Sequence, residues 1–90
     1  MDITRVLTIS TAHITEETNN KLQDNGEFNF MALSVYKKGD YGYWIYVDLP
    51  CTDIPKDLKQ CLELALKHDC QWLCLDCDGE EVQELPTYNW

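Results

Sequence analysis

Apolar and polar residues alternate along this chain in blocks that predict six elements of secondary structure. Short blocks rich in β-branched and aromatic residues predict four strands, over Arg5–Ser10, Phe28–Lys37, Tyr41–Leu49 and Trp72–Cys77. Two blocks with helical spacing predict one helix between the first and second strands and another between the third and fourth. The resulting order is strand, helix, strand, strand, helix, strand.

The first helix is predicted over Glu16–Asn25. Thr15 offers a hydroxyl N-cap, two glutamates follow in the first turn where the helix dipole favours anions, and Gly26 suits the position after the last turn. The apolar side of this helix consists only of Ile14, Thr18 and Leu22. Such a thin apolar side predicts a helix that packs lightly.

The second helix has Pro55 in its first turn, where the missing proline N–H costs nothing. Its apolar stripe consists of Ile54, Leu58, Cys61, Leu62, Ala65 and Leu66. The polar residues outside the stripe are Lys56, Asp57, Lys59, Gln60, Glu63 and Lys67. This pattern predicts a helix that buries one side against a sheet.

The order of elements predicts a single α+β domain over residues 1–90 with the ferredoxin-like β-α-β-β-α-β topology. In that topology an antiparallel sheet carries both helices on one face. Lys38–Asp40 contains a glycine and can join the middle strands as a hairpin. Alternation along the third strand turns Trp44 and Tyr46 toward the opposite, open face. We expect Gln71–Trp90 to fold back over that face as a short fifth strand and a tail.

The charge of the chain is strongly asymmetric. Sixteen acidic and seven basic residues give a net charge of −9, and no lysine or arginine follows Lys67. The carboxylates without nearby counter-charge are Asp69, Asp76, Asp78, Glu80, Glu81 and Glu84. Because this charge repels nucleic acid and acidic membranes, the expected partner is a basic protein surface. Alternatively, the acidic band is a solvated surface without a partner.

Two further features bear on the cellular compartment. The chain has no apolar run near the ~18–20 residues needed to span a bilayer, and its start lacks the basic and apolar segments of a signal peptide. Its five cysteines are an odd number, which fits free thiols in a reducing compartment. We therefore expect a cytoplasmic location.

A zinc site is one candidate chemistry. Cys74 and Cys77 have CxxC spacing, and with His68 and Cys70 they could supply four zinc ligands. However, residues three apart on an extended strand project to opposite faces, whereas a zinc knuckle needs a turn between its cysteines. Structural cysteines are therefore the favoured interpretation.

Catalysis is the other candidate chemistry. Residues 75–79, LDCDG, resemble the DxDG loop of haloacid dehalogenase-type phosphatases, in which the first aspartate attacks phosphorus and Mg²⁺ is bound. The chain is too short to supply the rest of such a site, and Asp-Gly favours a hairpin turn. His13 could act as an acid or base, but hydrogen bonding to backbone near a helix cap is favoured. No catalytic residue, metal or cofactor is predicted, and an enzyme using His13 or the Asp76/Asp78 loop is the alternative.

Three segments carry a family resemblance: LTISTAHITEET, YKKGDYGYWIYV and WLCLDCDGEEVQELPTYNW. Together they resemble an uncharacterised family of short acidic proteins found in bacteria, their phages and their mobile elements. The resemblance covers nearly the whole chain and implies no established activity or site residue. A mobile-element setting implies proteins that bind and disable a host system, including anti-CRISPR and anti-restriction proteins.

These observations predict a non-enzymatic binding module, an inhibitor or adaptor that occludes the nucleic-acid-binding surface of a host protein. Its carboxylates would imitate phosphates while aromatic side chains anchor the contact. The residues predicted to bind the partner are Trp44, Tyr46, Asp76, Asp78, Glu80, Glu81, Glu84, Tyr88 and Trp90. Two alternatives stay open: the aromatic residues belong to the core, or they join two copies of the chain through the open sheet face.

Overall fold

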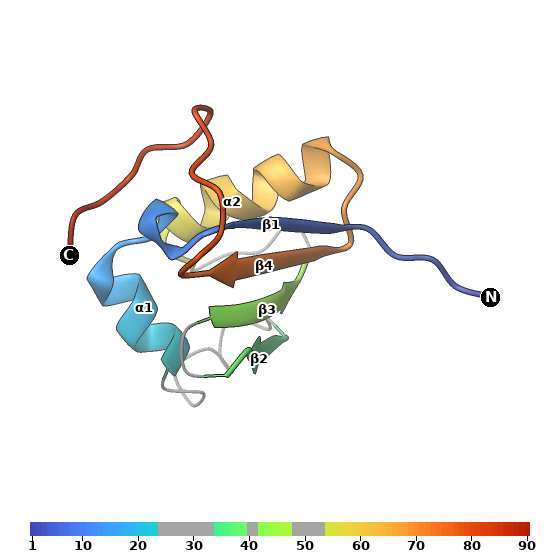
Figure 1. Ribbon diagram of the computed structural model, residues 1–90, viewed down its shortest axis with the longest axis horizontal. Coiled ribbons are helices and arrows are strands. Elements are labelled where there is room, and N and C mark those ends of the chain that lie inside the picture. Colours follow the sequence, from blue (N-terminus) through green and yellow to red (C-terminus); the bar gives the residue numbers. More distant parts are fainter. Residues whose placement is uncertain (24–33, 40–41, 48–53) are drawn as a thin grey trace.

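The structure is a computed structural model that describes residues 1–23, 34–39, 42–47 and 54–90. The elements follow one another in the predicted order, with a short 3-10 turn after the first strand (Figure 1). Their bounds are β1 Val6–Ser10, η1 Thr11–His13, α1 Glu16–Gln23, β2 Val35–Lys37, β3 Gly42–Tyr46, α2 Lys56–Lys67 and β4 Trp72–Asp76. Parts of the predicted elements, at residues 24–26, 28–33, 40–41 and 48–49, lie outside the described residues, as do residues 50–53.

The four strands within the described residues form one mixed sheet in the order β1-β4-β3-β2. β4 pairs in parallel with β1 and antiparallel with β3, and β3 pairs antiparallel with β2. The prediction of an antiparallel sheet was therefore wrong, and this strand order does not confirm the ferredoxin-like topology. The position of β4 has a physical reason: its central residues Leu73, Cys74 and Leu75 are all fully buried. An interior strand buries such residues better than an edge strand, and β1 leaves Val6 exposed at the edge.

The core lies on the face of the sheet that α2 covers. Side chains from three strands meet both helices there, and the core residues are Ile9, Ile14, Leu22, Tyr43, Ile45, Leu58, Cys61, Leu62, Ala65, Cys70, Leu73 and Leu75. The predicted stripe of α2 is correct except at Leu66, which is 54% exposed. The buried arc of the helix runs instead through Asp57 and Leu64. At 3.6 residues per turn, Leu66 falls just beyond the opposite edge of this arc.

Asp57 fastens the beginning of α1 to the beginning of α2. Its carboxylate accepts hydrogen bonds from the Thr15 N–H, at 2.8 Å, and from the Thr18 hydroxyl, at 3.0 Å. Thr15 also caps α1 as predicted, because its hydroxyl oxygen accepts the Thr18 N–H at 3.2 Å. The thin apolar side of α1 is buried in the core, since Ile14 and Leu22 have no exposed surface. The helical spacing predicts Asp57 on the polar side of α2, and its burial shows that this prediction is wrong.

The C-terminal residues 79–90, here called the tail, contain no helix or strand. The prediction of a fifth strand was therefore wrong. The tail leaves the end of β4 and returns beside η1 (Figure 1). Its Val82 and Leu85 pack against the core on the helix-covered side of the sheet, so the tail does not lie over the opposite face. Within the described ranges, no helix is long and apolar enough to cross a membrane.

Candidate functional site

The face of the sheet opposite α2 carries a cluster of large apolar side chains. Because alternate residues of a strand point to opposite faces, the neighbours of the core residues Leu73 and Ile45 point away from the helices. The strand register brings these outward residues into rows, with Val6 beside Trp72 and Trp72 beside Tyr46. We call this surface the aromatic face, and it consists of Val6, Tyr36, Trp44, Tyr46 and Trp72. No element in the described part of the chain covers it.

Three rings of the aromatic face contact one another, and the two tyrosines among them are exposed. Trp72 lies at the centre, with the Tyr46 ring edge-on at a centroid distance of 5.2 Å and the Tyr36 ring tilted by 51° at 6.1 Å. Tyr36 is 58% exposed and Tyr46 is 43% exposed. A contiguous exposed aromatic surface of this kind is typical of a contact site for another molecule.

A shallow apolar pocket lies within this surface. Its volume is about 330 Å³, and its described lining consists of Thr4, Val6, Tyr36, Trp44 and Trp72. Three of these five residues are aromatic, and none carries a charge. The pocket can therefore bind a ligand through ring faces and apolar contacts, with few polar groups to direct it.

An ion pair borders the aromatic face. The Lys38 ammonium lies 2.7 Å from the Asp76 carboxylate and 5.3 Å from the centroid of the Trp44 ring. The hydrogen bond to Asp76 raises the pKa of Lys38. The same bond lowers the pKa of Asp76, and the backbone N–H of Asp78 adds to that effect. Asp76 therefore acts here as the counter-ion of the protein's own lysine.

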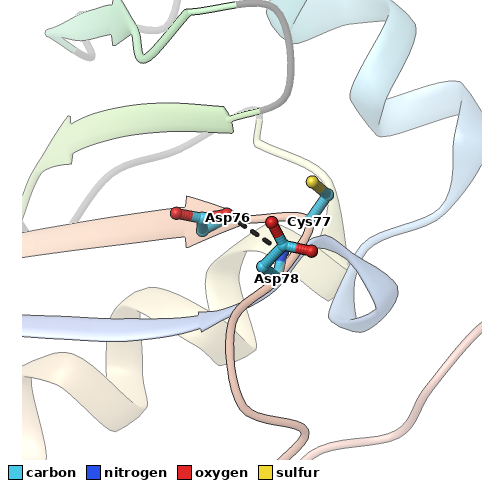
Figure 2. A group of neighbouring side chains, drawn as sticks. All are labelled: Asp76, Cys77 and Asp78. Atoms are coloured by element: carbon cyan, nitrogen blue, oxygen red, sulfur yellow. Dashed lines mark hydrogen bonds between the residues drawn. The ribbon is translucent and has the colours of Figure 1, made fainter.

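The turn after β4 brings Asp76, Cys77 and Asp78 close together, as Figure 2 shows. The ligand atoms of these three residues lie within 4.8 Å of one another, which could suit a metal ion. However, both oxygens of Asp76 already have partners, Lys38 at one and the Asp78 N–H, at 2.9 Å, at the other. The predicted turn is confirmed, with the Gly79 N–H donating to the Asp76 carbonyl, but no second strand follows it.

Two of the described thiols, Cys61 and Cys77, are poorly suited to redox or nucleophilic chemistry. Burial, reinforced by the Asp57 carboxylate, raises the pKa of Cys61 to about 12. Desolvation and the carboxylates of Asp78 and Asp76 also raise the pKa of the exposed Cys77 thiol. A reactive thiol needs the opposite shift. Among the described residues, the four candidate zinc ligands His68, Cys70, Cys74 and Cys77 do not form a cluster.

His13 has a structural position. Its side chain is 1% exposed, its Nδ1 lies 2.9 Å from the Pro86 carbonyl oxygen, and its Nε2 lies 2.9 Å from the Val82 nitrogen. Because the Val82 N–H can only donate, Nε2 must accept, and the ring proton lies on Nδ1. Both ring nitrogens are thus used to hold the tail, and this geometry favours the backbone-bonding interpretation of His13 over acid–base catalysis.

Further hydrogen bonds fasten the tail along η1. The Ser10 N–H donates to the Glu80 carbonyl at 2.9 Å, and the Tyr88 N–H donates to the Ala12 carbonyl at 2.8 Å. The indole N–H of Trp90 donates to the Ile14 carbonyl at 2.9 Å. The tail is therefore part of the folded structure along its length and is not a loose acidic arm.

The structure separates the predicted partner-binding residues into two groups. Trp44 and Tyr46 lie together on the aromatic face, with Asp76 at its border. The remaining residues lie in the turn or on the tail, and they are Asp78, Glu80, Glu81, Glu84, Tyr88 and Trp90. Val6, Tyr36 and Trp72 also belong to the face but are not among the predicted contact residues. The alternation of Trp72 with the apolar Leu73 is the signal that could have identified it.

The chain belongs to a family of unknown function, DUF5983, whose C-terminal domain model matches residues 6–90. No curated protein and no solved structure matches the chain. The resemblance to an uncharacterised family is thereby confirmed. The family assigns no activity and no site residue to these surfaces, so any functional argument depends on their geometry and charge.

Proposed function

We propose that this protein is a non-enzymatic binding module that attaches to a basic surface of another protein through its aromatic face. The observation that supports the proposal most directly is a cluster of two exposed tyrosines and two partly exposed tryptophans on a molecule with a net charge of −9. Tyrosine and tryptophan are enriched among the residues that carry most of the binding energy at interfaces. Charge then determines which partners approach, because a field of this sign attracts basic surfaces and repels acidic ones.

The two groups of predicted contact residues have different parts in this proposal. The aromatic face, with Trp44 and Tyr46, supplies the buried anchors. The carboxylates of Glu80, Glu81 and Glu84 are exposed on the tail, away from the aromatic face, and add to the negative field that attracts a basic partner over long range. Charges outside the buried contact mainly change the rate of association and its salt dependence, whereas central aromatic residues mainly change the rate of dissociation.

The biological setting completes the proposal. The partner is a host protein with a nucleic-acid-binding surface, the module acts in the cytoplasm, and it is encoded on a phage or mobile element. Its carboxylates occupy positions that phosphates would take, so it works as an inhibitor or adaptor. An anti-CRISPR or anti-restriction activity is the specific form of this function. What supports this part is the resemblance of the sequence to mobile-element proteins together with the acidic charge.

Affinity capture from the host cell tests the proposal. The bait is the wild-type chain, compared with a Tyr36→Ala, Tyr46→Ala double variant and with Leu66→Ala as a matched control. Leu66 is an exposed apolar residue on α2, on the other side of the sheet. We expect the double variant to lose a partner that Leu66→Ala retains, by at least about tenfold in affinity.

The charge part of the proposal is tested on the partner so identified. Binding should weaken between about 0.1 M and about 1 M salt, because the Debye length falls from about 10 Å to about 3 Å. Replacing Glu80, Glu81 and Glu84 by Gln should reduce the association rate. A partner bound equally well by all variants, or insensitive to salt, overturns the proposal. Self-association that the double variant abolishes, measured by light scattering, would show instead that the face joins two copies of the chain.

A further inference from the structure

We infer that the pocket on the aromatic face receives an arginine side chain of the basic partner. The inference rests on the proposed function and deepens it by naming the chemical group that the face recognises. It depends on the size and lining of the pocket, on the arrangement of its rings, and on a cation that the protein already places against one of them.

The size and lining of the pocket fit one side chain. Its volume of about 330 Å³ lies at the lower end of the range for small-molecule sites. The described lining contributes aromatic rings, the apolar Val6 side chain and two hydroxyl groups, on Thr4 and Tyr36. Such a lining offers ring faces to its occupant and no formal charge.

The rings that form the walls diverge. The Tyr36 and Trp72 planes are inclined at 51° with centroids 6.1 Å apart, so they do not stack face to face on each other. A planar group that enters the pocket can therefore contact a ring face that no other ring of the protein stacks on. The face of an aromatic ring is negative, so it attracts a cation within about 6 Å of the centroid.

One wall of the pocket already attracts a cation in this structure. The Lys38 ammonium lies 5.3 Å from the centroid of the Trp44 ring. Its charge is balanced by the Asp76 carboxylate at 2.7 Å, so the pair as a whole does not repel a second cation. Trp44 is therefore held in an environment that suits positive charge, and the net charge of −9 favours the arrival of one.

Arginine suits this pocket better than lysine. An ammonium group is compact and strongly hydrated, so it loses hydrogen bonds to water when it enters a pocket. The two hydroxyl groups in the described lining can replace only a few of those hydrogen bonds. A guanidinium is planar, more weakly hydrated, and stacks on aromatic faces. Nucleobases could also stack on such rings, but their phosphates are repelled by the acidic molecule.

The test is an NMR titration with N-acetyl-L-arginine amide as the probe and N-acetyl-L-citrulline amide as its neutral isostere. The readout is the indole N–H signals of the three tryptophans. Trp90, whose indole N–H is bonded to Ile14, serves as the control within the same spectrum. We expect the arginine probe to shift the Trp44 and Trp72 signals at millimolar concentration without shifting Trp90. The citrulline probe should bind about three- to fivefold more weakly.

Two variants complete the experiment. Tyr36→Leu keeps an apolar side chain at an exposed position on an edge strand but removes one ring. We expect this variant to bind the arginine probe about two- to fivefold more weakly. Leu66→Ala should leave the titration unchanged. Equal binding of the two probes, or equal shifts of all three tryptophans, overturns the inference.

The two proposals fail in different ways. If the arginine probe binds selectively but capture of the partner does not depend on Tyr36 and Tyr46, the pocket stands and the proposed function is overturned. If capture depends on those tyrosines but the two probes bind equally, the interface stands and arginine recognition is overturned.

Discussion

The tail and the aromatic face are both rich in aromatic residues, yet they use their chemical groups in opposite ways. In the tail, the Trp90 indole and the Tyr88 N–H donate to carbonyl groups of residues 12–14, and His13 bonds to two further positions. On the aromatic face, Tyr36 and Tyr46 lie half open to solvent against a central Trp72. The two regions differ in which polar groups already have hydrogen-bond partners within the chain. Amino-acid composition alone does not reveal this difference.

This difference has an energetic consequence for binding. Releasing the tail would break several hydrogen bonds, each worth about 1 kcal/mol net, before any partner could use its groups. The aromatic face is preorganised on a sheet, so a partner gains apolar burial without that cost. The comparison therefore favours the face as the contact site and the tail as a structural clamp that presents carboxylates.

The largest expected effect is at the clamp. His13→Ala removes the hydrogen bonds to Val82 and Pro86, each worth about 1 kcal/mol net, and leaves a cavity where a residue that is 1% exposed was packed. We expect the free energy of unfolding to fall by about 2–4 kcal/mol in urea titrations. His68→Ala, at an exposed histidine, is the control and should change it by less than about 0.5 kcal/mol. Similar losses in both variants would show that His13 does not hold the tail.

A smaller effect is expected at the end of the tail. Trp90→Phe removes the indole donor to Ile14 but keeps an aromatic ring, so it should cost about 1 kcal/mol. Hydrogen exchange should become faster at the Tyr88 amide and remain unchanged in β4. Unchanged exchange at Tyr88 would contradict the proposed clamp at this end.

The aromatic face should tolerate truncation better than the clamp. Tyr36→Ala removes a ring that is 58% exposed on an edge strand, so we expect less than about 1 kcal/mol of destabilisation. The measurement is the same urea titration. A loss as large as that of His13→Ala would mean that the face is a structural cluster, and it would weaken the case for a binding surface.

The smallest effect is electrostatic and concerns the border of the face. The hydrogen bond from Lys38 lowers the pKa of Asp76 in the folded state. This hydrogen bond stabilises the fold fully at any pH above the pKa that Asp76 has in the unfolded chain. The stabilisation is lost as the pH falls through the lower pKa that Asp76 has in the folded protein. Lys38→Met should raise the pKa of Asp76 toward its ordinary value, as followed by carboxyl carbon shifts in NMR. An unchanged titration would show that the Asp78 N–H alone sets this pKa.

The sequence predicted local features well. The Thr15 cap, the apolar side of α1 and most of the α2 stripe follow from spacing within a few residues, and the structure confirms them. The alternation that turned Trp44 and Tyr46 away from the core is equally local. What these features share is that neighbouring residues in the chain determine them.

Features that depend on distant residues were not predictable in this way. Nothing in the helix around Asp57 indicates that Thr15 and Thr18, about forty positions earlier, will bury its carboxylate. The strand order failed for the same reason, because the order of elements does not specify which strands pair. The role of His13 depends on Val82 and Pro86, which lie 69 and 73 positions away.

The interior place of β4 has a consequence for the folding of the newly made chain. β4 follows the other described strands in the sequence, yet it lies between β1 and β3 and pairs with both. Its contact with the start of the chain spans 66 positions, as in the bond from Arg5 to Gln71. During synthesis, β1 has no strand to pair with until residues 72–76 have left the ribosome. Sheet assembly is therefore a late and comparatively slow step, governed by closure of this long loop.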